Sequence, residues 1–284
     1  MVKDKKILII SGATASGKSA LALETAIAKN GVVINADSMQ LYEELPILSA
    51  QPAKEDQAQA PHFLYSALKH NQNSSLALWL EMVIKEINWA FEGEKLPIIV
   101  GGTGLYLSKL IDGINEIPQI DENLRLEMRQ LAENSTREEL VEMLKDLGEE
   151  KIENLDKQRL TRRLEVLKQT GKSLSWWQDQ PNKVFYPKEC FEHINVNLPR
   201  DELYRNCDER MLKMFENGAL KEVEELISQN PDDNSLITKT IGFLEIKDYL
   251  QGNMSKEETI NLASQKTRNY AKRQLTWFRN QFSF

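Results

Sequence analysis

A glycine-rich motif near the start of the sequence constrains the fold of this chain more than any other feature. It matches the pattern G-x-x-x-x-G-K-[ST] in full and consists of Gly12, Ala13, Thr14, Ala15, Ser16, Gly17, Lys18 and Ser19. Residues 6–10 before it predict a buried strand, and residues 18–29 after it predict a helix. A loop in this position surrounds a phosphate group with backbone N–H groups, while Lys18 adds positive charge and the Ser19 hydroxyl can bind Mg²⁺. The motif therefore predicts a site for a diphosphate or a polyphosphate.

Three further apolar stretches predict strands, at residues 32–35, 61–65 and 96–100. An amphipathic helix is expected over residues 75–91, and a second one after residues 101–106. Strands that alternate with helices and are apolar throughout are typical of a parallel sheet that is covered on both sides. We therefore expect an α/β fold, a P-loop NTPase-like parallel sheet with helices on both faces.

The character of the sequence changes after Pro118. Residues 121–172 are strongly charged, favour helices and contain no convincing strand, whereas residues 192–198 again predict a strand and more helices follow. We therefore expect a P-loop core domain made of residues 1–117 and 190–284, and an inserted all-helical subdomain at residues 118–189.

The net charge of −7, from 36 basic and 43 acidic residues, on its own disfavours a nucleic-acid partner. The distribution of charge changes that conclusion. Residues 264–284 contain five basic residues and no acidic one, and residues 157–172 contain six basic residues and one acidic residue. Such segments form basic surfaces on an acidic protein, so RNA binding remains open.

No apolar run approaches the roughly 20 residues of a membrane-spanning helix, and the apolar stretch near the N-terminus is too short for a signal peptide. The two cysteines, Cys190 and Cys207, have neither the spacing of metal ligands nor that of a disulfide framework. We expect a soluble, cytoplasmic protein without a membrane partner.

Asp37 is the only aspartate that closely follows a predicted strand. Nucleoside triphosphatases with this phosphate loop usually hold their metal with an Asp at the end of an apolar strand, but residues 96–100 lead into Gly101-Gly-Thr-Gly104 instead. Ligands of such sheets bind beyond the carboxyl ends of the strands, which places Asp37, Thr103 and the phosphate loop around one crevice. The alternatives are a helix N-cap for Asp37 and a simple turn residue for Thr103.

Five segments, taken together, are more specific than the phosphate loop alone. They are residues 12–19, Asp37-Ser-Met-Gln40, Gly101-Gly-Thr-Gly-Leu-Tyr106, Gln158-Arg-Leu-Thr-Arg162 with the Arg-Leu-Glu that follows it, and Lys272-Arg-Gln-Leu-Thr-Trp-Phe-Arg279. In this order they resemble the tRNA dimethylallyltransferases, also called isopentenyl-tRNA transferases, over nearly the whole chain.

The resemblance implies transfer of a dimethylallyl group from dimethylallyl diphosphate to the exocyclic N6 amine of the adenosine 3′-adjacent to the tRNA anticodon, with release of diphosphate. It implies Mg²⁺ as the cofactor and the anticodon stem-loop of tRNA as the partner, and we expect a monomer.

The resemblance also assigns roles to individual residues. Asp37 resembles the family's general base, and Lys18, Thr103 and Arg210 are expected to act in catalysis with it. Residues 12–19 would bind the diphosphate, with Ser19 as the metal ligand. Contacts to tRNA, in which Arg163 also suits backbone phosphates, are expected from Asp37, Ser38, Met39, Gln40, Thr103, Arg125, Gln158, Arg159, Leu160, Thr161, Arg162, Lys239, Gly242, Lys272, Arg273, Gln274 and Arg279.

The chemistry of the reaction fits these residues independently. An allylic diphosphate ionises once the charge of its leaving diphosphate is neutralised, which the loop amides, Lys18 and Mg²⁺ at Ser19 can do. An adenine amine is a weak nucleophile, so a carboxylate such as Asp37 that accepts its proton would help. The target base has to leave its stack to reach a buried site.

The sequence departs from the family pattern at three positions where the family usually has basic residues. These positions hold Glu43, Gln51 and Asn206, while Arg210 keeps its place. Contacts to the diphosphate or the RNA could therefore be weaker here.

Three other functions remain open from the sequence. One is a small-molecule kinase that uses the same loop, and another is an isopentenyltransferase acting on free adenine nucleotides. The third is an RNA-binding module without catalysis, which the intact Lys18, Ser19, Asp37 and Thr103 disfavour.

Overall fold

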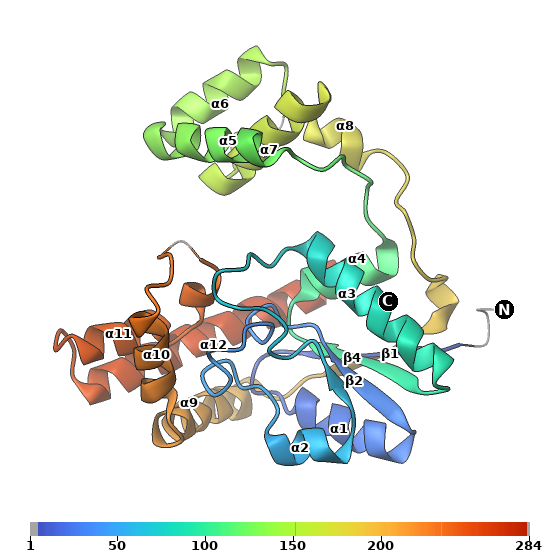
Figure 1. Ribbon diagram of the computed structural model, residues 1–284, viewed down its shortest axis with the longest axis vertical. Coiled ribbons are helices and arrows are strands. Elements are labelled where there is room, and N and C mark those ends of the chain that lie inside the picture. The colour runs from blue at the N-terminus through green and yellow to red at the C-terminus, as the bar shows by residue number, and fades with distance from the viewer. Residues whose placement is uncertain (1–4, 151, 234, 283–284) are drawn as a thin grey trace. The chain divides into compact units, whose positions relative to one another are not determined.

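A computed structural model describes residues 5–150, 152–233 and 235–282 (Figure 1). The chain forms two compact units. The larger one combines the chain up to Ile111 with the chain from Phe185, and the smaller one is Asp112–Val184. The smaller unit thus begins and ends a few residues before the predicted insertion at 118–189. The reason is an antiparallel bridge, in which Ile114 and Lys183 exchange backbone hydrogen bonds of 3.2 and 2.8 Å and so join the two connecting segments within this unit.

A five-stranded parallel sheet forms the centre of the larger unit, in the order β3-β2-β4-β1-β5. This confirms the predicted fold class. The strands predicted at 61–65 and 192–198 are present but shorter or shifted. The bounds are Ile7–Gly12 for β1, Gly31–Asn35 for β2, His62–Phe63 for β3, Leu96–Gly101 for β4 and Phe191–Val196 for β5.

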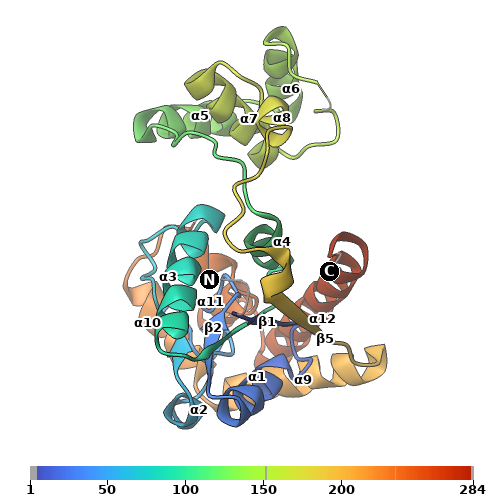
Figure 2. The same ribbon diagram turned by 90° about the vertical axis from the view of Figure 1, so that its right-hand side faces the viewer.

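The two faces of the sheet pack against different helices (Figures 1 and 2). Side chains alternate between the faces of a strand, so Leu8, Val33 and Ile98 pack with Ala22 and Ala26 of α1 on one face. Helix α3 covers the other face. Because both faces are covered, β1 and β2 are buried along their whole length, as their uninterrupted apolar sequences predict.

Eight helices complete the described part of the larger unit, together with short 3₁₀ turns at Lys188–Cys190 and Ile237–Lys239. None of the described helices is both long and apolar enough to cross a membrane. The helices are α1 (Lys18–Ala28), α2 (Lys54–Gln59), α3 (Leu76–Glu92), α4 (Gly104–Asp112, whose last residue belongs to the smaller unit), α9 (Arg200–Glu216), α10 (Ala219–Ser228), α11 (Phe243–Leu250) and α12 (Lys256–Gln281).

The smaller unit consists of four helices around an apolar core of its own, which includes Leu140, Leu144, Leu160 and Leu164. Its described residues contain no strand, in agreement with the charged, helix-favouring sequence. The helices are α5 (Glu122–Asn134), α6 (Arg137–Asp146), α7 (Lys157–Thr170) and α8 (Leu174–Gln178).

A buried ion pair links α7 to the start of α8. The Arg163 guanidinium lies 2.6 Å from a carboxylate oxygen of Glu149 and donates to the Ser175 hydroxyl at 3.0 Å, and the other oxygen of Glu149 accepts from the Leu174 N–H. Both charged side chains are almost fully buried. The expected role of Arg163 as a phosphate contact is therefore wrong, because its guanidinium is used inside the helical unit.

The ends of β2 and β4 approach each other closely at the carboxyl edge of the sheet. A Cβ atom at Gly101 would lie 2.1 Å from the carbonyl oxygen of Ala36, a distance that no side chain tolerates. In addition, the Ala36 N–H donates to the Val100 carbonyl at 2.8 Å. The glycine at position 101 therefore allows the chain that leaves β2 to stay paired with β4.

We predict that Gly101→Ala lowers the free energy of unfolding by about 1–3 kcal/mol or more, because the new methyl group meets backbone that cannot rotate away. Urea unfolding checks this. Gly93→Ala is the matched control, since the nearest atom to a Cβ at Gly93 lies 3.6 Å away. Equal stability losses in the two variants would contradict the close-approach argument.

Candidate active site

The phosphate loop has the conformation that its sequence predicts. Ala15 and Gly17 have positive φ angles of 62° and 87°, and the Ser16 N–H donates to the Ala13 carbonyl at 3.2 Å to close the turn. Helix α1 begins at Lys18, directly after Gly17, which has no side chain to cap it. No side chain at Gly17 therefore occupies the first N–H groups of α1, and these groups can bind an anion instead.

Two cations lie against this loop. Lys18 Nζ donates to the Ala13 carbonyl at 3.3 Å, and the Arg210 guanidinium donates to the Thr14 hydroxyl at 2.5 Å. Burial lowers the pKa of Lys18 to about 8; nearby Asp37 opposes this shift and Arg210 adds to it. Burial also lowers the pKa of Arg210. Two partly desolvated cations beside a ring of N–H groups form a site that favours an anion.

Asp37 follows β2 in a turn that a buried asparagine holds in place. The Asn35 side chain accepts from the Asp37 N–H at 2.8 Å and donates to the Asp37 and Leu64 carbonyls, each at 2.9 Å. The Asp37 carboxylate accepts from the Met39 N–H at 3.0 Å. No helix begins here, since α2 starts at Lys54, so the helix-cap alternative for Asp37 is excluded.

Thr103 lies beside the same turn, at the start of α4. Its hydroxyl accepts from the Ser38 N–H at 3.2 Å, and its own N–H donates to the Ala36 carbonyl at 3.2 Å. Thr103 therefore contacts the backbone on both sides of Asp37. Thr103 thus lies next to the Asp37 turn, as predicted from the ends of the two strands, but it is not among the residues that line the cleft with the phosphate loop.

Asp37 and the phosphate loop line one cleft of about 440 Å³. A carboxylate and an anion-binding loop thus share the same space. The complete lining is Thr14, Ala15, Ser16, Gly17, Lys18, Ser19, Asp37, Gln40, Ser49, Ala50, Asn206, Glu209, Arg210 and Lys213.

Residues 38–51, which form one wall of the cleft, are held in place by hydrogen bonds within the segment and by a side chain of α10. Gln40 donates to the carbonyls of Ser49 and Ala50 at 2.9 and 2.7 Å. The two carboxylate oxygens of Glu222, on α10, accept from the N–H groups of residues 47 and 48 at 2.7 and 3.0 Å. Burial raises the pKa of Glu222, and these hydrogen bonds oppose the shift. Sequence reasoning identified Gln40 but missed both Asn35 and Glu222.

Helix α12 packs directly onto the glycine-rich turn after β4. A Cβ at Gly104 would lie 2.0 Å from the ring of Trp277. Gln274 is buried, donates to the Gly102 carbonyl at 2.9 Å and accepts from the Thr14 N–H at 2.8 Å. Its amide is therefore used to join the turn to the phosphate loop, a role that the expected tRNA contact did not include.

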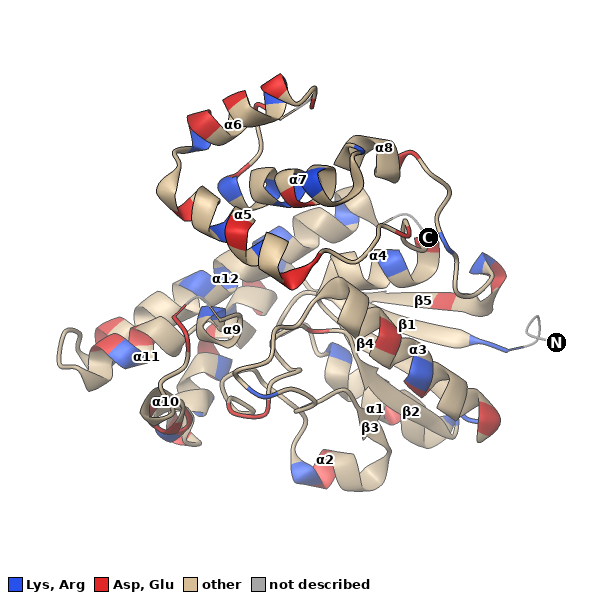
Figure 3. Ribbon diagram, turned by 45° about the horizontal axis from the view of Figure 1, so that its top comes forward, with Lys and Arg blue, Asp and Glu red and all other residues tan. Residues whose placement is uncertain are grey.

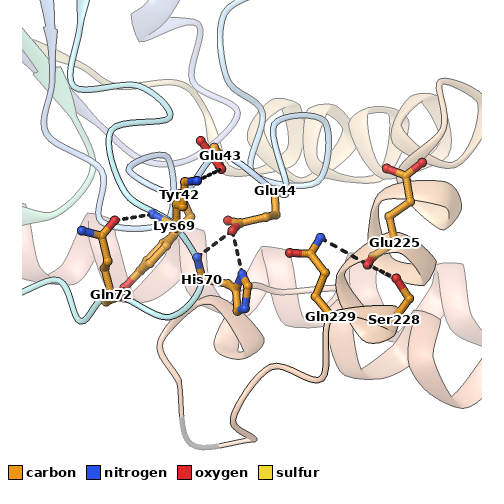
Figure 4. Close-up of polar contacts among 9 residues, drawn as sticks. All are labelled: Tyr42, Glu43, Glu44, Lys69, His70, Gln72, Glu225, Ser228 and Gln229. Atoms are coloured by element: carbon orange, nitrogen blue, oxygen red, sulfur yellow. Dashed lines mark hydrogen bonds and ion pairs between the residues drawn. The ribbon is translucent and has the colours of Figure 1, made fainter.

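The three unusual positions all make contacts within the protein. Glu43 pairs with Lys69 at 4.0 Å, next to a Glu44–His70 pair at 2.9 Å (Figure 4). Gln51 donates to the Tyr42 carbonyl at 2.7 Å. Asn206 donates to the Ala15 carbonyl at 3.3 Å, so an amide supports the phosphate loop where an arginine was expected.

The expected tRNA contacts on α7 divide according to burial. Leu160 and Thr161 are buried in the helical unit, whereas Gln158 and Arg159 are exposed and Arg162 is partly exposed. Arg159 pairs with Asp156, the N-cap of α7, at 3.7 Å, and Arg162 pairs with Glu165 of α7 at 3.1 Å. Arg125 of α5 pairs in the same way with Glu122. The exposed residues remain predicted contacts.

In the larger unit, the predicted tRNA contacts Lys239, Lys272, Arg273 and Arg279 are exposed. Figure 3 shows basic residues along α12 as well as along α7. Lys272 and Arg273 line a groove of about 510 Å³ on α12, and neither these two nor Arg279 forms an ion pair with any described residue. Gly242, by contrast, is buried against Leu48 at the start of α11 and has a φ of 99°. Close packing therefore explains why a glycine occupies this position.

Comparisons with known proteins decide the family. The family model described as IPP transferase matches residues 40–281. The chain belongs to the IPP transferase family. It is 42% identical to the tRNA dimethylallyltransferase of Rickettsia massiliae (strain Mtu5), over 98% of this chain and 78% of that protein. It is 40% identical to the enzyme of the same name from Wolbachia pipientis wMel, over 97% of this chain and 93% of that protein.

Solved structures of IPP transferases agree. The tRNA isopentenylpyrophosphate transferase of Bacillus halodurans has a TM-score of 0.70 at 31% identity, covering 98% of this chain and 88% of that one. A eukaryotic dimethylallyltransferase acting on tRNA has a TM-score of 0.79 at 27% identity, covering 96% and 70%. The family, the fold class and the class of enzyme predicted from the sequence are thereby confirmed.

The charge state of Lys18 makes anion binding depend on pH. Protonated Lys18 attracts a diphosphate and neutral Lys18 does not, and its pKa in the free protein is about 8. Affinity for inorganic pyrophosphate should therefore fall as the pH rises through 8, by up to about tenfold per pH unit. Titration calorimetry over this range measures it.

Lys18→Arg is the control, because arginine keeps its charge at these pH values while the ionisation of pyrophosphate itself affects both proteins alike. The affinity of wild type relative to this variant should fall with pH. Parallel profiles between about pH 7 and 10 would show that Lys18 does not titrate there.

Proposed function

We propose that this IPP transferase moves a dimethylallyl group from dimethylallyl diphosphate to the N6 amine of the adenosine 3′-adjacent to the tRNA anticodon, and releases diphosphate. One observation carries the proposal: Asp37 and the phosphate loop line the same cleft. A site for the leaving group and a base for the incoming amine are the two parts that this reaction needs. We further expect the enzyme to act as a monomer in the cytoplasm.

The phosphate loop, Lys18 and Arg210 hold the diphosphate and stabilise the charge that it gains as the bond from its oxygen to the allylic carbon breaks. Both cations already lie against the loop, so they need no rearrangement when this charge develops. Fixed donors in a partly desolvated site stabilise such charge more than water does.

Mg²⁺ fits the oxygen donors of this cleft. The Ser19 hydroxyl is a hard ligand, and the Ser16 hydroxyl is buried without a hydrogen-bond partner among the described residues. The described residues contain no group of three or more His, Cys, Asp or Glu side chains that could hold a metal ion. Ser19 would thus hold the ion together with diphosphate oxygens and water, an arrangement that Mg²⁺ favours. When bound, it would neutralise charge on the leaving diphosphate.

Asp37 accepts a proton from the N6 amine as the amine nitrogen bonds to the allylic carbon. The lone pair of this nitrogen is delocalised into the adenine ring, so removal of the proton assists the attack. The turn made by Asn35 and Thr103 keeps the Asp37 backbone in place. We also expect Thr103, which contacts the backbone of this turn, to contact the target nucleotide.

The exposed cations of α7 and α12 bind the tRNA backbone, each within its own unit. The target adenosine leaves its stack to enter the cleft, as bases do in other base-modifying enzymes. These local basic surfaces allow RNA binding by a protein whose net charge is −7.

Transfer of label tests the proposal directly. The protein is incubated with labelled dimethylallyl diphosphate or labelled ATP, with unmodified tRNA, with AMP or without acceptor. We expect prenyl label on tRNA only. Phosphate transfer from ATP would instead indicate a kinase, and prenyl transfer to AMP an enzyme for free nucleotides.

Asp37→Asn should leave both substrates bound while the chemical step slows by about 10²–10⁴-fold, the usual contribution of a general base. An amide keeps the size of the side chain and the acceptor for the Met39 N–H, but it does not take up the proton. A single-turnover assay with preformed complex measures this step. A near-wild-type rate in a folded variant would reduce Asp37 to a structural residue.

Binding of tRNA should weaken steeply with salt. Neutralising Arg162, Lys272 and Arg273 together should flatten the slope of log K against log salt by about 2–3 units, because each phosphate contact contributes about one. Arg163 is unsuitable for this set since its loss would disrupt the helical unit. An unchanged slope in the triple variant would move the RNA surface elsewhere.

A further inference from the structure

Helix α9 presents one polar face to the phosphate cleft. Its four lining residues are Asn206, Glu209, Arg210 and Lys213. Their spacing of three, four and seven residues places them on one side of a helix. Leu203 and Cys207 of the same helix pack with Ala13 and so hold the helix against the phosphate loop. This face therefore has a fixed position relative to the phosphate loop.

Two of these residues already contact the loop. Asn206 donates to the Ala15 carbonyl and Arg210 to the Thr14 hydroxyl. Lys213 lies one turn beyond Arg210, is exposed, and forms no ion pair with any residue that the structure describes. Its ammonium group is therefore available to a ligand in the cleft.

The charges that line the cleft show what Lys213 contributes. Lys18, Arg210 and Lys213 are positive, and Asp37 and Glu209 are negative, so the lining has a net charge of 3 − 2 = +1. Without Lys213 it would be neutral, although the expected ligand is a multiply charged anion. Gln51 and Asn206 occupy two positions where basic residues were expected and add no charge.

We propose that Lys213 is a further binding residue for the diphosphate of the prenyl donor. The inference rests on the proposed function for the identity of the donor. It assigns Lys213 to binding of the donor and of the released diphosphate, and not to proton transfer. The competing explanation is that Lys213 only balances Glu209, which lies four residues earlier on the helix, at a spacing that suits an ion pair.

The test is titration calorimetry with inorganic pyrophosphate and Mg²⁺. Lys213→Met keeps an unbranched side chain and removes the charge, and it should weaken pyrophosphate binding about fivefold, as for loss of one exposed charge contact. The KM for dimethylallyl diphosphate should rise by a similar factor with little change in kcat. Lys221→Met is the matched control, because Lys221 is an exposed lysine of α10 that pairs with Glu225 and lines none of the cleft.

Two further variants separate donor binding from charge balance. In a Glu209→Gln background, Lys213→Met should still weaken pyrophosphate binding, whereas a loss that disappears in this background would overturn the proposal. Unchanged pyrophosphate affinity in Lys213→Met alone would also overturn it. Asn206→Arg should restore affinity to the Lys213→Met protein, since it returns a cation to the same face.

Pyrophosphate binding is measured without tRNA and without transfer. A protein whose affinity depends on Lys213 but which transfers no prenyl group would therefore retain this site and lose the proposed function. Transfer to tRNA with pyrophosphate affinity that is independent of Lys213 would retain the function and remove the site.

Discussion

The close approach of β4 to the end of β2 is the constraint on which the whole site depends. The pairing of the two strands continues one residue beyond β2, through the Ala36 N–H and the Val100 carbonyl. Gly101 allows this, and the N–H of Thr103 then donates to the Ala36 carbonyl. The direction in which the chain leaves β2 is thus set by backbone hydrogen bonds. The position of the Asp37 carboxylate follows from that direction and from the Asn35 side chain.

The cations of the site are held in an environment that disfavours their charge. Lys18 and Arg210 are both partly removed from water and repel one another, and among the described residues two carboxylates, Asp37 and Glu209, line their cleft. A bound anion removes this unfavourable arrangement. By linkage, an anion that binds only the folded chain also raises the free energy of unfolding of the larger unit, which contains both cations. The diphosphate would thus serve both as part of the substrate and as a further counter-ion for these two cations.

Local sequence predicted those parts of the molecule whose structure depends on near neighbours. The phosphate loop follows from its glycines, the buried strands follow from their apolar runs, and Asp37 was identified because it closes a strand. The contacts of Glu222 and Gln274 could not be predicted, because their partners lie 175 and 260 residues away. Nothing in the sequence near these residues indicates where their partners are.

In the smaller unit, by contrast, the sequence led to a less accurate prediction, because a whole segment was assigned one role. Residues 158–162 were expected to face RNA together, but the helical repeat turns Leu160 and Thr161 towards the core. Arg163 pairs with Glu149, an acid of this charged segment to which sequence reasoning assigned no role. This pair depends on how α7 packs against Glu149 and the start of α8, and a pattern of charges along the sequence does not show that packing.

The hydrogen bonds of Gln274 bear on the order in which the protein acquires its site during synthesis. The phosphate loop is made well before α12, because 260 residues separate Thr14 from Gln274. The Thr14 N–H and the Gly102 carbonyl have no glutamine to bridge them until α12 has been added and has docked. A nascent chain with its sheet already formed would still lack this bridge. The motif that appears complete within eight residues of sequence is completed in space by a side chain 260 residues further along.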